Sequence, residues 1–257
     1  MTRIPRLTAQ GQRQRLVVIL VLFLALVLLL LALAAIQASE ATPEEQADPR
    51  PRPTASFSPL PSAEPSDPAD PSTPDAVAVL AELDTVPVAA HRADGYDRDD
   101  FGSAWADVDD NGCDTRNDIL RRDLTEAVFK SGSSCVIVSG ELDDPYTATV
   151  IAFVRGPGTS DDVQIDHIVP LSWAWGYGAA DWTDGQRRAF ANDPSNLRAV
   201  EGHANMSKGD SGPGEWLPDN TAFRCAYVAS FVDVVVEYRL AIPAADRTAI
   251  RSVLADC

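Results

Sequence analysis

The longest apolar stretch of the chain lies near its N-terminus. Residues 16–36 contain no charged side chain and consist mainly of Leu, Val and Ala. About 20 apolar residues are enough for a helix to cross a bilayer. Four arginines precede this run and acidic residues follow it, which places the N-terminus in the cytoplasm. We therefore expect a cytoplasmic segment 1–15 and a transmembrane helix 16–36, with a cleaved signal peptide as the alternative.

The next segment, residues 37–75, lacks a hydrophobic pattern. It is rich in Pro, Ala, Ser, Thr, Asp and Glu and has almost no large apolar residues. Such a composition buries too little surface to offset the entropy of ordering the chain. We expect a disordered linker that holds the following domain away from the membrane.

Apolar periodicity resumes after residue 75 and predicts one α+β domain over residues 76–257. The expected helices span residues 76–83, 117–130, 181–192, 202–208, 221–240 and 243–257. The expected strands span residues 135–140, 147–154, 163–169 and 196–200.

The net charge of the chain limits which classes of function this domain can have. The net charge is −17, and because residues 1–36 contain only basic charges, the rest of the chain carries −21. This excludes a protein that binds polyanions through a broad basic surface. Residues 181–210 are closer to neutral, with four basic and five acidic residues. Binding to a nucleic acid would therefore be weak, salt-sensitive and without sequence preference.

The four cysteines indicate an oxidising compartment. Their spacing contains no CxxC and fits no zinc ribbon. An even number beyond a membrane segment predicts two disulfides, for which three connectivities exist. Pairing Cys113 with Cys135 and Cys225 with Cys257 is favoured because each bond closes a local loop. In the chain-entropy model such loops are worth roughly 3 kcal/mol each.

An acidic turn precedes the second expected helix. Asp107, Asp109 and Asn111 are followed by Gly112, as at positions one, three, five and six of an EF-hand loop. Position twelve falls on Asp118, where Glu is usual. Two interpretations stay open: a Ca²⁺ loop, or an acidic turn constrained by Cys113 that leads into a capped helix.

The candidate chemistry lies at Asp166 and His167, at the end of the expected strand 163–169. Asn196 follows 29 residues after His167, and Asn205 comes 9 residues later. An imidazole can deprotonate water near neutral pH, and a divalent ion can stabilise charge on a phosphoryl group. We expect His167 as base, Asp166 and Asn205 as metal ligands, and Asn196 as the residue that fixes the loop around His167. Lys208, one turn after Asn205, is expected to reach a phosphate.

These residues and their surroundings resemble the HNH, or ββα-metal, endonucleases. The similarity is closest to the C-terminal HNH domain of GmrSD-type restriction enzymes and of small secreted actinobacterial proteins. The matching segments lie between Tyr96 and Cys257 and include Ile165–Leu171, Phe190–Leu197, Asn205–Asp210 and Trp216–Pro218. The first position of the HNH motif is occupied here by Asp166-His167, where His-His is common in the family. The last position is occupied by Asn205, where His is common. This oxygen-rich set suits Mg²⁺ or Mn²⁺ better than Zn²⁺.

The resemblance implies a ββα-metal core within a disulfide-stabilised domain with flanking helices. It also implies that His167 is the general base, that Asp166 and Asn205 bind the metal, and that Asn196 orients the site. The expected function is a membrane-anchored extracellular metal-dependent endonuclease that hydrolyses DNA with little sequence specificity, with RNA as an alternative substrate and no obligate protein partner. The alternative is a non-catalytic extracellular binding module that retains the HNH scaffold.

Overall fold

The computed structural model describes residues 74–257. The expected transmembrane helix 16–36 and nearly all of the expected linker lie outside the described residues. Within residues 74–257, no helix is both long and apolar enough to cross a membrane.

The described chain is a mixed α+β fold, as the sequence predicts. The α-helices are α2 (Ala76–Thr85), α3 (Thr115–Asp123), α4 (Leu171–Gly176), α5 (Asp184–Ala191), α6 (Gly202–Lys208), α7 (Arg224–Glu237) and α8 (Ala244–Leu254). The strands are β1 (Thr125–Phe129), β2 (Ile137–Asp143), β3 (Val150–Val154), β4 (Val163–His167) and β5 (Leu197–Glu201). Short 3₁₀ helices are η1 (Arg98–Phe101), η2 (Ala179–Asp181), η3 (Pro194–Asn196) and η4 (Thr221–Phe223).

The strands form two separate antiparallel sheets. One sheet has the order β1-β2-β3, and the other pairs β4 with β5. In the second sheet Ile165 lies opposite Ala199, and His167 lies opposite Leu197. Helix α6 follows β5 directly, so β4, β5 and α6 make a strand–strand–helix unit.

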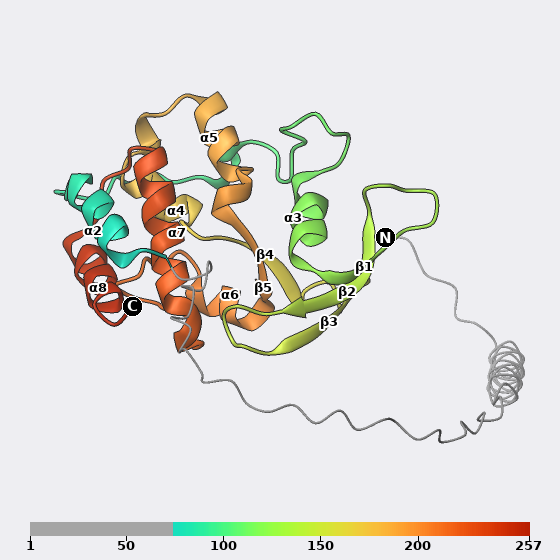
Figure 1. Ribbon diagram of the computed structural model, residues 1–257. Helices are drawn as coiled ribbons and strands as arrows, with labels where there is room; N and C mark the ends of the chain where they lie inside the picture. The colour runs from blue at the N-terminus through green and yellow to red at the C-terminus, as the bar shows by residue number, and fades with distance from the viewer. Residues whose placement is uncertain (1–73) are drawn as a thin grey trace, which may run out of the picture. The chain divides into compact units, whose positions relative to one another are not determined.

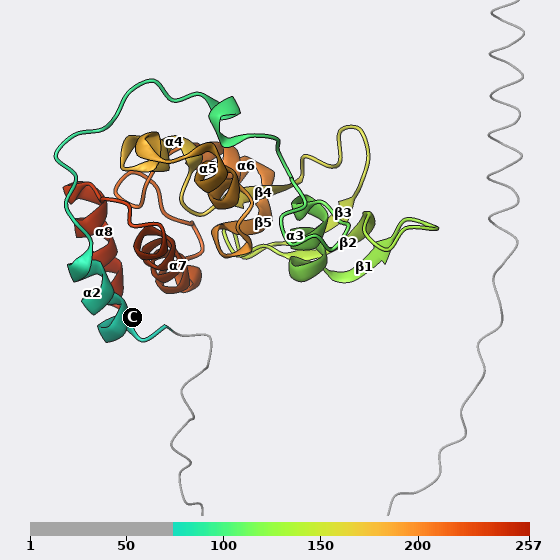
Figure 2. The same cartoon turned by 90° about the horizontal axis from the view of Figure 1, so that it is seen from above.

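This unit lies between two hydrophobic cores. Figures 1 and 2 show β4, β5 and α6 between a helical part (α2, α7 and α8) and the β1–β3 sheet with α3. Val163 and Ile165 of β4 pack in the core formed with α3, β2 and β3. Ile168, just after β4, and Val200 of β5 pack in the helical core. The β4–β5 pair is therefore held from both sides, which makes its end a rigid platform.

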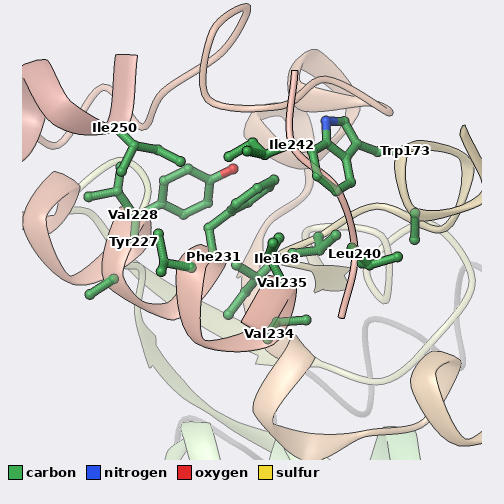
Figure 3. Packing of buried hydrophobic residues seen from close by; sticks show 14 of the residues in the cluster. Ile168, Trp173, Tyr227, Val228, Phe231, Val234, Val235, Leu240, Ile242 and Ile250 are labelled. Atoms are coloured by element: carbon green, nitrogen blue, oxygen red, sulfur yellow. The ribbon is translucent and has the colours of Figure 1, made fainter. Parts of the chain in front are cut away.

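Helix α7 is the centre of the larger core. Tyr227, Val228, Phe231, Val234 and Val235 of this helix are all buried. Figure 3 shows them packed with Ile168, Trp173, Leu240, Ile242 and Ile250 from surrounding segments. The run Val234–Val236 favours a strand by propensity alone, but burial on most sides of the helix outweighs that small preference.

The expected helix 117–130 is confirmed only over its first half. Helix α3 ends at Asp123, and residues 125–129 form β1 instead of continuing a helix to residue 130. Leu124 already has an extended conformation, and the following Thr and Val belong to the β-branched residues that strands favour. The Asp123 carboxylate accepts hydrogen bonds from Arg122 and from the backbone N–H of Ala199. These bonds tie the end of α3 to β5 and leave β1 free to pair with β2.

Both favoured disulfides are present. Cys113 is bonded to Cys135, and Cys225 is bonded to Cys257. The first joins the start of α3 to the segment before β2. The second ties the C-terminus to the start of α7.

We expect loss of the Cys225–Cys257 bond to destabilise the helical core. In the double variant Cys225→Ser/Cys257→Ser, the free energy of unfolding should fall by about 3 kcal/mol because the unfolded chain gains freedom. Urea denaturation without reductant measures this change. Reduced and oxidised wild-type protein should differ in the same direction, and equal denaturation midpoints would contradict the expectation.

Candidate functional site

Two side chains of β4 face two side chains of α6. Alternation along the strand points Gln164 and Asp166 to the same side. Asn205 and Lys208 are three positions apart and share one face of α6. Asn205 donates to Gln164 Oε1 at 2.9 Å, and Lys208 Nζ donates to Asp166 Oδ1 at 2.8 Å. The first residue of α6, Gly202, lies against the backbone that precedes β4. Only glycine fits there, because a Cβ would lie 2.1 Å from the Asp161 carbonyl oxygen.

Asp166 and Lys208 form a buried ion pair. Their side chains are 5% and 0% exposed. Lys208 Nζ also donates to the His167 backbone oxygen at 2.7 Å, and the Tyr146 hydroxyl donates to Asp166 Oδ2 at 2.5 Å. Burial lowers the pKa of Lys208, and the Asp166 carboxylate opposes that shift. Burial and the Asp166 charge raise the pKa of Tyr146, so this phenol stays protonated and donates.

The expectation that Lys208 reaches a phosphate does not agree with this geometry. Its ammonium points into the protein and is bonded to Asp166 and to the His167 backbone. Withdrawing it would leave a buried carboxylate without its counter-charge, which is costly. Lys208 therefore supports β4 and does not line the cleft.

His167 has its ring fixed by the end of α5. Its Nε2 lies 2.9 Å from the Ala191 carbonyl oxygen. The last carbonyls of a helix have no partner within the helix and can only accept. Nε2 must therefore carry the hydrogen, which leaves the lone pair on Nδ1. Trp105 stacks on the imidazole, with the two planes 12° apart.

The imidazole is neutral at pH 7. Burial lowers the pKa of His167 to about 4; the Ala191 hydrogen bond and Asp166 oppose this, while Lys208 and Arg98 add to it. Among the described residues, Nδ1 has no hydrogen-bond partner. A neutral imidazole with a free Nδ1 lone pair can accept a proton from water.

Asn196 is completely buried and holds the chain that follows His167. Its Oδ1 accepts from the Val169 N–H at 2.8 Å, and its Nδ2 donates to the Val169 oxygen at 3.2 Å. Its backbone oxygen accepts from the Ile168 N–H. The Asn196 side chain thus makes the two hydrogen bonds to Val169 that a further residue of β5 would make. This substitution ends the backbone pairing of β4 with β5.

A cleft of about 490 Å³ opens beside these residues. Its lining includes Asp166, His167 and Asn205. It also includes residues from other segments, namely Tyr96, Arg98, Ile165, Pro170, Leu171, Ser172, Gly209 and Asp210. The structure therefore brings the expected base and both expected metal ligands to one cavity.

The donor set of the cleft fits a hard divalent ion. A carboxylate offers about four acceptor positions, and Asp166 uses two. Asn205 Oδ1 accepts no hydrogen bond from the described residues. Between residues 74 and 257, no group of three or more His, Cys, Asp or Glu is arranged to hold a metal. An ion here would therefore have two protein ligands, one carboxylate and one carboxamide. Mg²⁺ can be bound by so few protein groups because it keeps several water ligands.

The acidic turn is closed by its own hydrogen bonds. Gly112 N donates to Asp107, and the Asn111 amide donates to Asp109 and Asp118. Asn111 Oδ1 accepts from Cys113 N. The Asn111 amide nitrogen thus donates to the carboxylates that a calcium ion would bind. Calcium binding at this turn stays a prediction.

The site thus consists of a strand–strand–helix unit with a histidine at the end of β4, a buried asparagine before β5 and an asparagine on α6. The model of the C-terminal domain of GmrSD restriction endonucleases matches residues 114–253, more than half of the chain. An "Uncharacterized secreted protein" of Arthroderma benhamiae is 38% identical over 199 residues, covering 77% of this chain and 92% of that protein. No solved structure matches. The chain belongs to the family of GmrSD C-terminal domains, as its sequence resemblance predicts.

Several contributors to the site were missed from the sequence. Tyr146 and the Ala191 carbonyl meet Asp166 and His167 only in the folded chain, and no local pattern marks them. Tyr96, Arg98 and Trp105 precede the family match, and they lie in a Tyr/Asp/Arg/Trp-rich segment that is visible in the sequence.

The two asparagines should behave differently. Asn196→Ala leaves both polar groups of Val169 buried without partners, so the free energy of unfolding should fall by about 2 kcal/mol or more. Asn205→Ala removes one half-exposed bond and should cost about 1 kcal/mol or less. Urea denaturation of both variants measures the difference. Equal losses would contradict the role of Asn196 as a buried support.

The ion pair should show strong coupling. Lys208→Met leaves Asp166 buried and unpaired and should lower the free energy of unfolding by about 3 kcal/mol or more. The double variant Asp166→Asn/Lys208→Met removes both charges and should be more stable than Lys208→Met alone. A double-mutant cycle by urea denaturation tests this. If the double variant loses the sum of the single losses, the pair does not act as a unit.

Proposed function

We propose that this protein is a metal-dependent phosphodiester hydrolase that cleaves nucleic acid with little sequence preference. The observation that carries the proposal is the state of His167. Its Nε2–H is committed to the Ala191 carbonyl, and its neutral Nδ1 is free in a cleft that also contains Asp166 and Asn205. Membership of the GmrSD C-terminal domain family supports the same activity.

His167 would act as the general base. A water that donates a hydrogen bond to Nδ1 would give its proton to that nitrogen as its oxygen attacks phosphorus. The scissile P–O bond would break in the same displacement, and the leaving oxygen would take its proton from solvent. The resulting positive charge on the imidazole is stabilised by the Ala191 carbonyl at the negative end of α5 and by Asp166. Trp105 and Asn196 keep the ring and its strand in place during this transfer.

Asp166 and Asn205 would hold a divalent ion, with Mg²⁺ as the best fit to their oxygens and Mn²⁺ as a substitute. When bound, such an ion stabilises negative charge on the phosphoryl and leaving oxygens. Lys208 and Tyr146 fix the Asp166 carboxylate before any ion arrives. This geometry lowers the cost of organising the site.

The acidic composition limits how the substrate is bound. Of the four basic residues in 181–210, Arg187 and Lys208 are buried in internal hydrogen bonds. That segment therefore offers no continuous track for a phosphate backbone. Weak, salt-sensitive binding suits degradation of nucleic acid better than recognition of a sequence.

We infer that the domain works outside the cytoplasm. Two disulfides and the secreted relative support this location. In this proposal residues 76–257 form the catalytic domain, and residues 16–36 act either as a membrane anchor or as a signal segment that is removed.

The purified protein should nick supercoiled plasmid with Mg²⁺ or Mn²⁺ and stop on addition of a chelator. His167→Ala should lower the rate by about 100-fold or more, because general base catalysis is lost. His203→Ala is the matched control, since His203 is exposed, pairs with Glu201 and does not line the cleft. Wild-type activity no greater than that of His167→Ala would reject the proposal in favour of a non-catalytic module.

A further inference from the structure

The charges around the cleft are paired, with one exception. Asp166 is balanced by Lys208 at 2.8 Å. Asp210 is bonded to Arg92 at 3.4 Å and to Ser172 at 3.0 Å. Among the residues that line the cleft, this leaves Arg98, which forms no ion pair or side-chain hydrogen bond with any described residue. The cleft thus presents one guanidinium that is not held in an ion pair by the described residues, although Asp97, Asp99 and Asp100 are its sequence neighbours.

The backbone of Arg98 is firmly fixed. It is the first residue of η1, which the Asp97 side chain caps through the Asp99 N–H. Phe101 anchors this turn in the helical core, and Arg187 donates to the Asp100 oxygen at 3.1 Å. Gly102 ends the turn with a φ of 74°, which favours glycine. The guanidinium is therefore presented to the cleft from a rigid base.

Tyr96 lies beside Arg98 on the lining of the same cleft and is 37% exposed. Phe101 and Trp175 support its ring at interplanar angles of 57° and 70°. Neither neighbour stacks parallel on it. A rigid, exposed aromatic ring beside a guanidinium is the combination that binds a base and its phosphate in single-stranded nucleic acid.

We propose that Tyr96 and Arg98 form a subsite for one unpaired nucleotide next to the bond that is cleaved, with its phosphate on Arg98 and its base against Tyr96. The subsite rests on the proposed function for the identity of the neighbouring reaction. It comes from a segment that precedes residues 114–253, the part matched by the family model.

A subsite of this kind favours single strands over duplex. The face of a base is accessible only when it is unpaired, whereas duplex binding depends on many phosphate contacts. This acidic protein has few cations to offer, and stacking does not depend on its net charge. Single-stranded substrate should therefore bind more tightly than duplex of the same sequence.

Fluorescence anisotropy can test this with the full chain and a labelled DNA oligonucleotide, single-stranded or annealed to its complement. Chelator is included so that metal-dependent cleavage does not consume the probe. Tyr96→Ala should weaken single-strand binding by about tenfold, and Tyr96→Phe should retain it because the ring remains. Arg98→Gln should weaken binding by about tenfold and reduce the salt slope by about 1. Arg239→Gln is the charge-matched control, since Arg239 is exposed and does not line the cleft.

The subsite is rejected if Arg98→Gln and Arg239→Gln behave alike, if Tyr96→Ala binds like Tyr96→Phe, or if wild-type protein binds duplex as tightly as single strand. Plasmid nicking with Mg²⁺ distinguishes failure of the subsite from failure of the proposed hydrolase activity. Only the subsite is overturned if His167→Ala abolishes nicking while Tyr96→Ala and Arg98→Gln bind the oligonucleotide like the wild type. Binding that depends on Tyr96 and Arg98, without nicking, supports the subsite and overturns the hydrolase.

Discussion

The buried pair of Asp166 and Lys208 joins the last turn of α6 to the end of β4. Two charges removed from water at this depth are tolerated only because each has its partner and further hydrogen bonds, here from Tyr146 and to the His167 backbone. The pair fixes Asp166 and places the backbone of His167 in one step. The face of β4 that carries the proposed metal ligand and the face that carries the proposed base consequently depend on the same interaction.

The opposite face of β4 presents His167 to the end of α5. A helix C-terminal carbonyl accepts its Nε2–H, Trp105 stacks on its ring, and Asn196 holds the chain beyond it. The three supports come from distant parts of the sequence and leave Nδ1 as the available nitrogen. Within residues 74–257 the ring is thus held by peptide and aromatic groups, with no titratable side chain bonded to it, as the proposed base requires.

Much of this architecture follows from the sequence. Periodicity predicts α2, α6, α7, α8 and the β4–β5 pair, because each has one clear buried pattern. Asp166, His167, Asn196 and Asn205 could be chosen because they lie in or next to that strand–strand–helix unit. The sequence does not predict β1, because the local preference of residues 125–129 is weak and their pairing with β2 decides the conformation. The orientation of Lys208 does not follow from the sequence, because no local pattern reveals that its ammonium is buried against Asp166.

Whether His167 can act as the base depends on the protonation of its ring, which NMR observes directly. Long-range ¹H–¹⁵N correlation spectra of uniformly ¹⁵N-labelled protein at pH 7, with His167→Ala for assignment, report which ring nitrogen of His167 carries hydrogen. We predict a neutral imidazole protonated at Nε2, with Nδ1 unprotonated. An Nδ1-protonated tautomer, or an imidazolium at that pH, would contradict the role of His167 as the base.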